Sequence, residues 1–235
     1  MSASFRTLVN SSVLKKQIVA ITGLVLVLFI LAHLSGNLLI LLGPEIFNGY
    51  TETLHAVPEL LWVARAGLIA AFIVHVYFTI LVTMENREAR AHSGGPQRYA
   101  VEATHGRTNF VKKYMIYTGL FAFAFLMLHL ADFTFPAKTG PKTELNGEAM
   151  LLFGLVWNSF LQIPRSVIYI VAVWCVGLHL SHGIQSLFQS IGFFHDRYTP
   201  VIYKASWVVG IAVAAGFSLI PVYVILRHYT IGPPM

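Results

Sequence analysis

Four histidines lie inside long apolar stretches of this sequence, where an imidazole side chain is rare and costly. They are His33, His75, His129 and His179, one in each of four separate stretches. Neutral imidazole is a common ligand of metals, and helix bundles hold cofactors by side chains from facing helices. One histidine in each of four stretches therefore predicts paired ligands inside a helical bundle.

Two of these stretches are similar to each other. A Thr-Gly dipeptide at residues 22–23 begins eleven positions before His33, and a second at residues 118–119 begins eleven positions before His129. The matching segments are KKQIVAITGLVLVLFILAHL and VKKYMIYTGLFAFAFLMLHL. The repeat indicates that these two histidines are counterparts.

The composition is that of a membrane protein. The chain of 235 residues is 56% hydrophobic and 11% charged, with a mean hydropathy of +0.68, whereas soluble domains are about 25% charged. Five stretches are long enough to cross about 30 Å of hydrocarbon, and they cover residues 16–42, 60–84, 112–135, 163–190 and 203–227. We expect an all-α bundle of five transmembrane helices in a single domain, residues 1–235. The single Cys175 excludes a disulfide framework.

The basic residues are distributed unevenly between the two sides of these spans. Eleven of the sixteen Lys and Arg residues fall in the N-terminal segment, in residues 85–113 and in residues 192–204. The positive-inside rule therefore predicts a cytoplasmic N-terminus and, with five spans, a C-terminus outside. Membrane topology accounts for the net charge of +6, so we expect no nucleic-acid partner.

The depths of the four histidines fall into two levels. At 1.5 Å per helical residue, His33 and His129 lie about 25 and 24 Å from the cytoplasmic edge, and His75 and His179 about 15 and 16 Å. We call His33 and His129 the outer pair and His75 and His179 the inner pair. Histidine is a common axial ligand of haem iron. The pattern predicts two bis-histidine b haems, with levels about 10 Å apart.

Small and hydroxylated residues accompany the proposed ligands. Gly36 and Gly183 each lie about one turn beyond a proposed ligand, where they would leave room for a flat porphyrin. Thr22 and Thr118 lie three turns before the outer-pair histidines, near the inner level, and would offer room and a hydrogen-bond partner. His182 lies one turn from His179 and is the alternative fourth ligand. We expect the remaining histidines to be solvated, and they are His55, His92, His105, His195 and His228.

These features resemble a known family, the five-helix, two-haem cytochrome b membrane-anchor subunit of succinate dehydrogenases and fumarate reductases. The resemblance covers nearly the whole chain. In that family the fourth ligand begins a His-x-x-x-Gly pattern, which His179 and Gly183 fit, so the resemblance favours His179 over His182. The supporting stretches are TGLVLVLFILAHLSGN, IVHVYFTILVTMENREAR, TGLFAFAFLMLHL and GLHLSHGIQSLFQSIGFF.

The resemblance implies a membrane anchor and electron relay in a bacterial cytoplasmic membrane. Partner subunits on the cytoplasmic face, a flavoprotein with covalent FAD and an iron–sulfur protein, would carry out the succinate or fumarate chemistry. Electrons would pass through the inner and outer haems to or from menaquinone or another quinone. The quinone would bind near the outer haem beside an acidic residue, for which Glu45, Glu52 and Glu59 in the expected outer loop 43–59 are candidates.

One position departs from part of that family. Some fumarate reductases have an intramembrane glutamate two residues before the fourth ligand, and Gly177 stands there in this chain. No predicted span has Asp or Glu in its interior, and Asp132 falls at the end of one. A transmembrane proton route that depends on this glutamate is therefore not expected.

Two other functions are compatible with buried histidines. One is a di-haem cytochrome b of another quinone-linked complex, such as a respiratory nitrate reductase or formate dehydrogenase, for which we expect a different ligand order, for instance two on one helix. The other is a small transporter that relays protons through histidines. Intramembrane carboxylates would favour the transporter, and the spans lack them.

Overall fold

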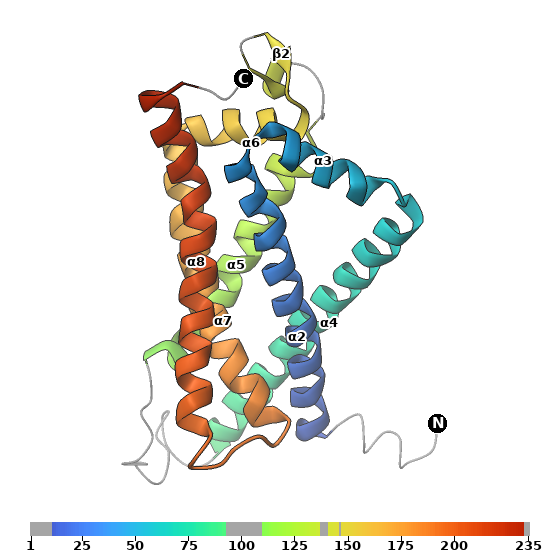
Figure 1. Ribbon diagram of the computed structural model, residues 1–235. Helices are drawn as coiled ribbons and strands as arrows, with labels where there is room; N and C mark the ends of the chain where they lie inside the picture. Colours follow the sequence, from blue (N-terminus) through green and yellow to red (C-terminus); the bar gives the residue numbers. More distant parts are fainter. Residues whose placement is uncertain (1–10, 93–109, 137–140, 146, 233–235) are drawn as a thin grey trace.

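The computed structural model describes residues 11–92, 110–136, 141–145 and 147–232. Five of its helices are long and apolar enough to cross a membrane, which confirms the predicted all-α membrane architecture (Figure 1). These are α2 (Ser12–Leu38), α4 (Pro58–His92), α5 (Phe110–Phe133), α7 (Ile163–Ser190) and α8 (Thr199–Thr230). The helical form follows from composition, because a chain in hydrocarbon must satisfy its backbone hydrogen bonds within each segment.

Helix α4 is longer than the predicted span 60–84. It begins at Pro58, where a proline is tolerated in the first turn, and continues to His92. Its last turns, from Glu85, were expected to belong to a loop. The sequence ENREARAH is rich in helix-forming Glu, Arg and Ala, so the helix continues after the apolar residues end.

The expected loop 43–59 is mostly helical. A short 3-10 helix, η1 (Leu39–Leu42), ends at Gly43, and α3 (Pro44–His55) begins immediately after it. Gly43 has φ of 109°, a conformation that residues with a Cβ rarely adopt, and Pro44 stands in the first turn of α3. The two residues turn the chain sharply at the end of α2.

The connection between α5 and α7 contains α6 (Leu151–Leu161). Before α6 come η2 (Pro141–Thr143) and a two-stranded antiparallel hairpin. The hairpin pairs β1 (Glu144–Leu145) with β2 (Glu148–Ala149). Helix α6 is apolar but too short to span a membrane. Trp157 on α6 is fully buried and stacks on Phe153, so α6 closes one end of the bundle (Figure 1).

Helix α7 is the centre of the bundle and packs against α2, α5 and α8. Its closest approach is to α8, where a Cβ on Gly177 would lie 2.5 Å from the carbonyl oxygen of Gly210. Small residues allow such close packing of helices in membranes. Gly177, which stands where some fumarate reductases have a glutamate, therefore lies in the contact between α7 and α8.

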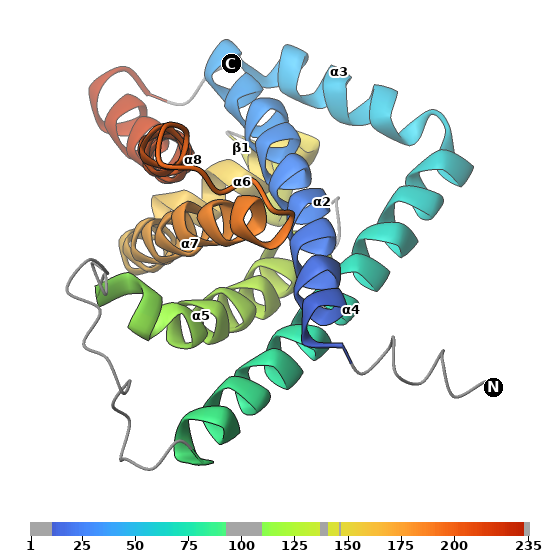
Figure 2. The same cartoon turned by 90° about the horizontal axis from the view of Figure 1, so that it is seen from below.

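Helix α4 packs against α2 and α3 and diverges from the other spanning helices (Figure 2). Four of the spanning helices therefore form two neighbouring pairs, α2 with α4 and α5 with α7. The pairs meet through the contact of α2 with α7. The repeated sequence segments lie on α2 and α5. Each pair thus contains one copy of the repeat and one helix with an inner-pair histidine.

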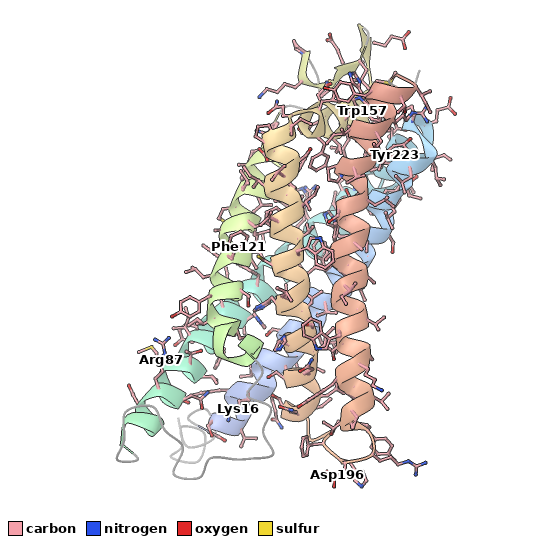
Figure 3. The ribbon with its side chains drawn as sticks, turned by 90° about the vertical axis from the view of Figure 1, so that its left-hand side faces the viewer. Lys16, Arg87, Phe121, Trp157, Asp196 and Tyr223 are labelled. Carbon is pink, nitrogen blue, oxygen red and sulfur yellow. The ribbon has the colours of Figure 1, made fainter. Side chains whose placement is uncertain are left out.

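Charged side chains distinguish the two ends of the bundle. Figure 3 shows Lys16, Arg87 and Asp196 at one end and Trp157 and Tyr223 towards the other. We call the first the basic end. The basic side chains that the structure describes there are those of Lys15, Lys16, Arg87, Arg197 and Lys204, and those towards the opposite end are Arg65, Lys142, Arg165 and Arg227. The other basic side chains of the sequence lie outside the description, and they are Arg6, Arg90, Arg98, Arg107, Lys112, Lys113 and Lys138.

Candidate functional site

The structure brings His33 of α2 and His129 of α5 together, as the predicted outer pair requires. Their ring centroids are 5.7 Å apart and their planes are nearly perpendicular, at 89°. Two metal–nitrogen bonds of about 2 Å, with the ring radii added, need a centroid separation of about 6 Å. The two rings are therefore spaced on the scale of ligands on opposite sides of one metal ion.

Aromatic side chains surround the outer pair. Phe29 stacks on His33 at 5.3 Å, and Tyr169 of α7 lies 6.2 Å from the ring of His129. The other ring contacts are with Phe217, Phe125 and Phe133. These residues provide an apolar, π-rich environment that suits a flat aromatic ligand.

His75 of α4 is oriented by the Thr-Gly dipeptide of α2. Its Nδ1 atom lies 3.2 Å from the hydroxyl of Thr22, and that hydroxyl donates to the carbonyl of Ile18 at 2.7 Å. The Thr22 oxygen can therefore accept a hydrogen bond from Nδ1–H. A proton on Nδ1 leaves the Nε2 lone pair for a metal, the usual arrangement of a ligating histidine.

His179 of α7 repeats this arrangement against α5. Its Nδ1 atom lies 3.2 Å from the hydroxyl of Thr118, which donates to the carbonyl of Met115 at 2.9 Å. The two inner-pair histidines thus have matching hydrogen-bond partners, and each contacts the helix that carries an outer-pair histidine.

Two further glycines belong to this site, the second residues of the repeated Thr-Gly dipeptides. A Cβ on Gly23 would lie 3.2 Å from Cε1 of His75, and a Cβ on Gly119 would lie 3.2 Å from Cε1 of His179. Contacts this short would displace the imidazoles by a few tenths of an ångström. The signal was present in the repeated Thr-Gly dipeptide, in which the threonine orients the ring and the glycine makes room for it.

The other two predicted glycines differ from each other. A Cβ on Gly36 would lie 2.7 Å from the ring of Tyr50 of α3, so Gly36 makes room for that aromatic side chain. A Cβ on Gly183 would meet no described atom within 4 Å. Only Gly183 therefore borders open space beside a proposed ligand.

His182 faces a different helix from His179. It is 3% exposed, its ring makes an edge contact with Trp207 of α8 at 5.8 Å, and its Nδ1 atom lies 3.1 Å from the hydroxyl of Ser181. His179 instead contacts α5. Of the two histidines, His179 is therefore the one that contacts Thr118, the counterpart of the threonine beside His75.

Gln185 of α7 has a buried side-chain amide that lies between the inner pair and the basic end. Gln185 is 2% exposed, and within the described residues neither its amide nitrogen nor its amide oxygen has a hydrogen-bond partner. It is six residues, about 9 Å, past His179 on α7. On α2, Lys15 lies about 10 Å from Thr22, is 8% exposed and forms an ion pair with Glu85. A buried amide without a partner fits a polar edge of a ligand, such as the carboxylates of a porphyrin.

A polar cluster lies at the opposite end of α5 and α7. Asp132 accepts a hydrogen bond of 2.8 Å from the hydroxyl of Tyr169 and lies 3.4 Å from the guanidinium of Arg165. Its side chain is 9% exposed. Cavities of about 170 and 240 Å³ border this cluster. Sequence reasoning noted only that Asp132 ends a span, because nothing in the sequence joins residues 37 positions apart.

The three candidate quinone acids lie elsewhere. Glu45 is on α3, Glu52 is also on α3 and Glu59 is in the first turn of α4, and all three are exposed. They do not line either of the two cavities beside Asp132.

The comparisons with known proteins find no matching family model, no matching curated protein and no matching solved structure. Within the described residues, no group of three or more His, Cys, Asp or Glu side chains is placed to hold a metal ion.

Proposed function

We propose that this chain is the di-haem cytochrome b membrane-anchor subunit of a succinate:quinone oxidoreductase. The observation that carries the proposal is the equivalent placement of two histidine pairs on four spanning helices. His33 and His129 lie side by side, and His75 and His179 are oriented by equivalent threonines. The order of the ligands and the number of spans agree with the family that the sequence resembles.

The residues fit two b haems, whose irons would each change oxidation state by one electron. His33 and His129 would hold the outer iron, and His75 and His179 the inner iron. Thr22 and Thr118 keep the proton on Nδ1 of the inner ligands, and Gly23 and Gly119 let these rings lie against the neighbouring helix. Gln185 would hydrogen-bond to the carboxylate edge of the inner porphyrin.

The two levels lie one beyond the other along the bundle. Eleven residues of α2, about 16 Å along its axis, separate Thr22, which contacts His75, from His33. This separation exceeds the 10 Å expected from assumed helix ends. Sites at two depths are what a relay across a membrane requires, because each electron can then move in two shorter transfers.

The basic end of the bundle would face the cytoplasm, by the positive-inside rule. The last turns of α4, with Arg87, extend the protein at this end. We propose that the iron–sulfur subunit docks here and that the flavoprotein with FAD binds through it. The physiological electron partner at the other side would be menaquinone or another quinone from the lipid.

The test is an optical and redox analysis of the purified protein and its ligand variants. We expect two low-spin b haems in the unchanged chain. His179→Ala should lose the inner haem and keep the outer one, whereas His182→Ala should keep both. Two low-spin haems in His179→Ala would contradict the assignment of the inner ligands, and a colourless unchanged protein would contradict the proposed function.

A further inference from the structure

The polar cluster of Asp132, Arg165 and Tyr169 is a built site in an apolar part of the molecule. Asp132 is 9% exposed and bonded to both other residues, and Tyr169 is 5% exposed. A buried carboxylate is costly unless it is paired and hydrogen-bonded, and carboxylates near the membrane interior commonly mark functional sites. The cluster is thus a candidate binding site, held between α5 and α7.

The two cavities connect this cluster with both the α6 side and the outer surface of the bundle. The cavity of about 170 Å³ is lined by polar residues that include Asn158, Gln162 and Lys142. The cavity of about 240 Å³ is lined by Leu128 and Ile168, whose side chains are 38% and 52% exposed. In a membrane these exposed apolar side chains face lipid. Because both cavities share Asp132, Gln162 and Arg165, a molecule entering from lipid would reach the ion pair directly.

The cluster also adjoins the outer histidine pair. Asp132 lies one helical turn after His129 on α5, and Tyr169 contacts both the ring of His129 and the ring of Phe133. A molecule held at Asp132 would therefore lie next to the outer redox centre of the proposed function.

The chemistry of the site selects a lipid-soluble molecule with a polar, oxygen-bearing head. The guanidinium of Arg165 donates hydrogen bonds to carbonyl oxygens, and the carboxylate of Asp132 accepts them from hydroxyl groups. A quinone presents carbonyl groups and its quinol presents hydroxyl groups, while the isoprenoid tail remains in lipid between Leu128 and Ile168. We propose that the quinone headgroup binds in the α5–α6–α7 cavity at Asp132 and Arg165, and not at Glu45, Glu52 or Glu59. This inference rests on the proposed function.

The test uses the full chain in nanodiscs and a short-chain probe, 2,3-dimethyl-1,4-naphthoquinone, with an azido derivative for photocrosslinking. We expect crosslinks on α5 and α7. Arg165→Gln and Asp132→Asn should each weaken probe binding about tenfold, the loss of one charge-assisted hydrogen bond. Glu59→Gln tests the competing quinone site in the 43–59 segment, and Glu144→Gln is a control at an exposed residue. Both variants should leave probe binding unchanged.

A second variant tests the site without breaking the ion pair, in case loss of the pair unfolds the protein. Ile168→Trp keeps Asp132 and Arg165 and fills the lipid side of the cavity, and it should also weaken binding. Crosslinks on α3 or the start of α4, or unchanged binding in Ile168→Trp, would overturn the inference. Haem content is measured in parallel. A protein with two haems that binds the probe elsewhere contradicts this site alone, whereas one without haem contradicts the proposed function.

Discussion

At the scale of single residues, the four histidines are distinguished by what holds their rings. The inner-pair rings each have a threonine hydroxyl at Nδ1, whereas the outer-pair rings lie among aromatic side chains, with the amide nitrogen of Asn37 3.4 Å from the ring nitrogens of His33. A partner at the second nitrogen fixes the tautomer and increases the basicity of the ligand. The two centres should therefore differ in electronic properties even though both have two histidine ligands.

The threonines provide a prediction about the inner centre, near whose level the sequence places them. Thr22 and Thr118 are on the helices of the outer ligands but contact the inner ones. Thr22→Val or Thr118→Val should weaken inner-haem affinity about 10–100-fold, as loss of an outer-shell partner does, and leave the outer haem in place. Haem content and redox titration measure this, and Thr22→Ser, which keeps the hydroxyl, is the matched control. Loss of the outer haem instead would contradict the observed contacts.

At the scale of elements, the helices are arranged by small residues and by connections. Gly177 and Gly210 bring α7 and α8 into backbone contact, and Gly43 with Pro44 turns α2 into α3. Because α3 lies against the end of α2, Tyr50 reaches Gly36. The short helices α3 and α6 thus close the end of the bundle opposite the basic end.

The contact between α7 and α8 can be tested by adding one methyl group. Gly177→Ala should destabilise the protein by about 1–3 kcal/mol, because its Cβ would overlap the Gly210 carbonyl and force the helices apart. Gly67→Ala on α4 is the control, since a Cβ there meets no described atom within 4 Å. Thermal unfolding in detergent measures both. Equal melting temperatures for the two variants would show that α7 and α8 do not make this contact.

At the scale of the whole molecule, the two ends of the bundle differ in charge and construction. The basic end consists mainly of helix ends and turns, and the other is covered by α3, α6 and the hairpin. This asymmetry suits a protein with soluble partners at one end and a lipid-soluble substrate near the other.

The asymmetry predicts where the partners dock. Arg87→Glu at the basic end should reduce co-purification of the iron–sulfur and flavoprotein subunits more than Lys142→Glu at the opposite end. Both side chains are exposed, so neither reversal should affect folding by more than about 0.5 kcal/mol. Quantification of the co-purified subunits decides between the two ends. The reverse order would mean that the topology is inverted.

A second prediction at this scale concerns protons. No described spanning helix has a carboxylate at mid-depth, and α8 packs directly against Gly177. We therefore expect electrons to cross the membrane without a matching return of protons. In proteoliposomes, succinate oxidation by menaquinone should therefore be slowed by an uncoupler, or fumarate reduction by menaquinol should build a membrane potential. Electroneutral turnover in both directions would contradict this and would imply a proton route along other groups.

The sequence by itself determined the five spans, because hydropathy and length are sufficient where every backbone group must be satisfied within its own helix. It also predicted which histidines lie at the same level, because helical rise converts sequence position into depth. The repeated Thr-Gly dipeptide was visible too. Its threonines could be placed near the inner level, but the rings that they contact could not be identified.

Only the tertiary structure decided how each helix is rotated and which neighbours it faces. A spanning helix such as α2 or α5 is apolar on all sides, so no polar face indicates its orientation. The contacts of Thr22 with His75, of Gly36 with Tyr50, and of His182 with α8 therefore followed from packing alone. The same reason applies to Asp132, Arg165 and Tyr169, whose meeting depends on how α5 and α7 lie against each other.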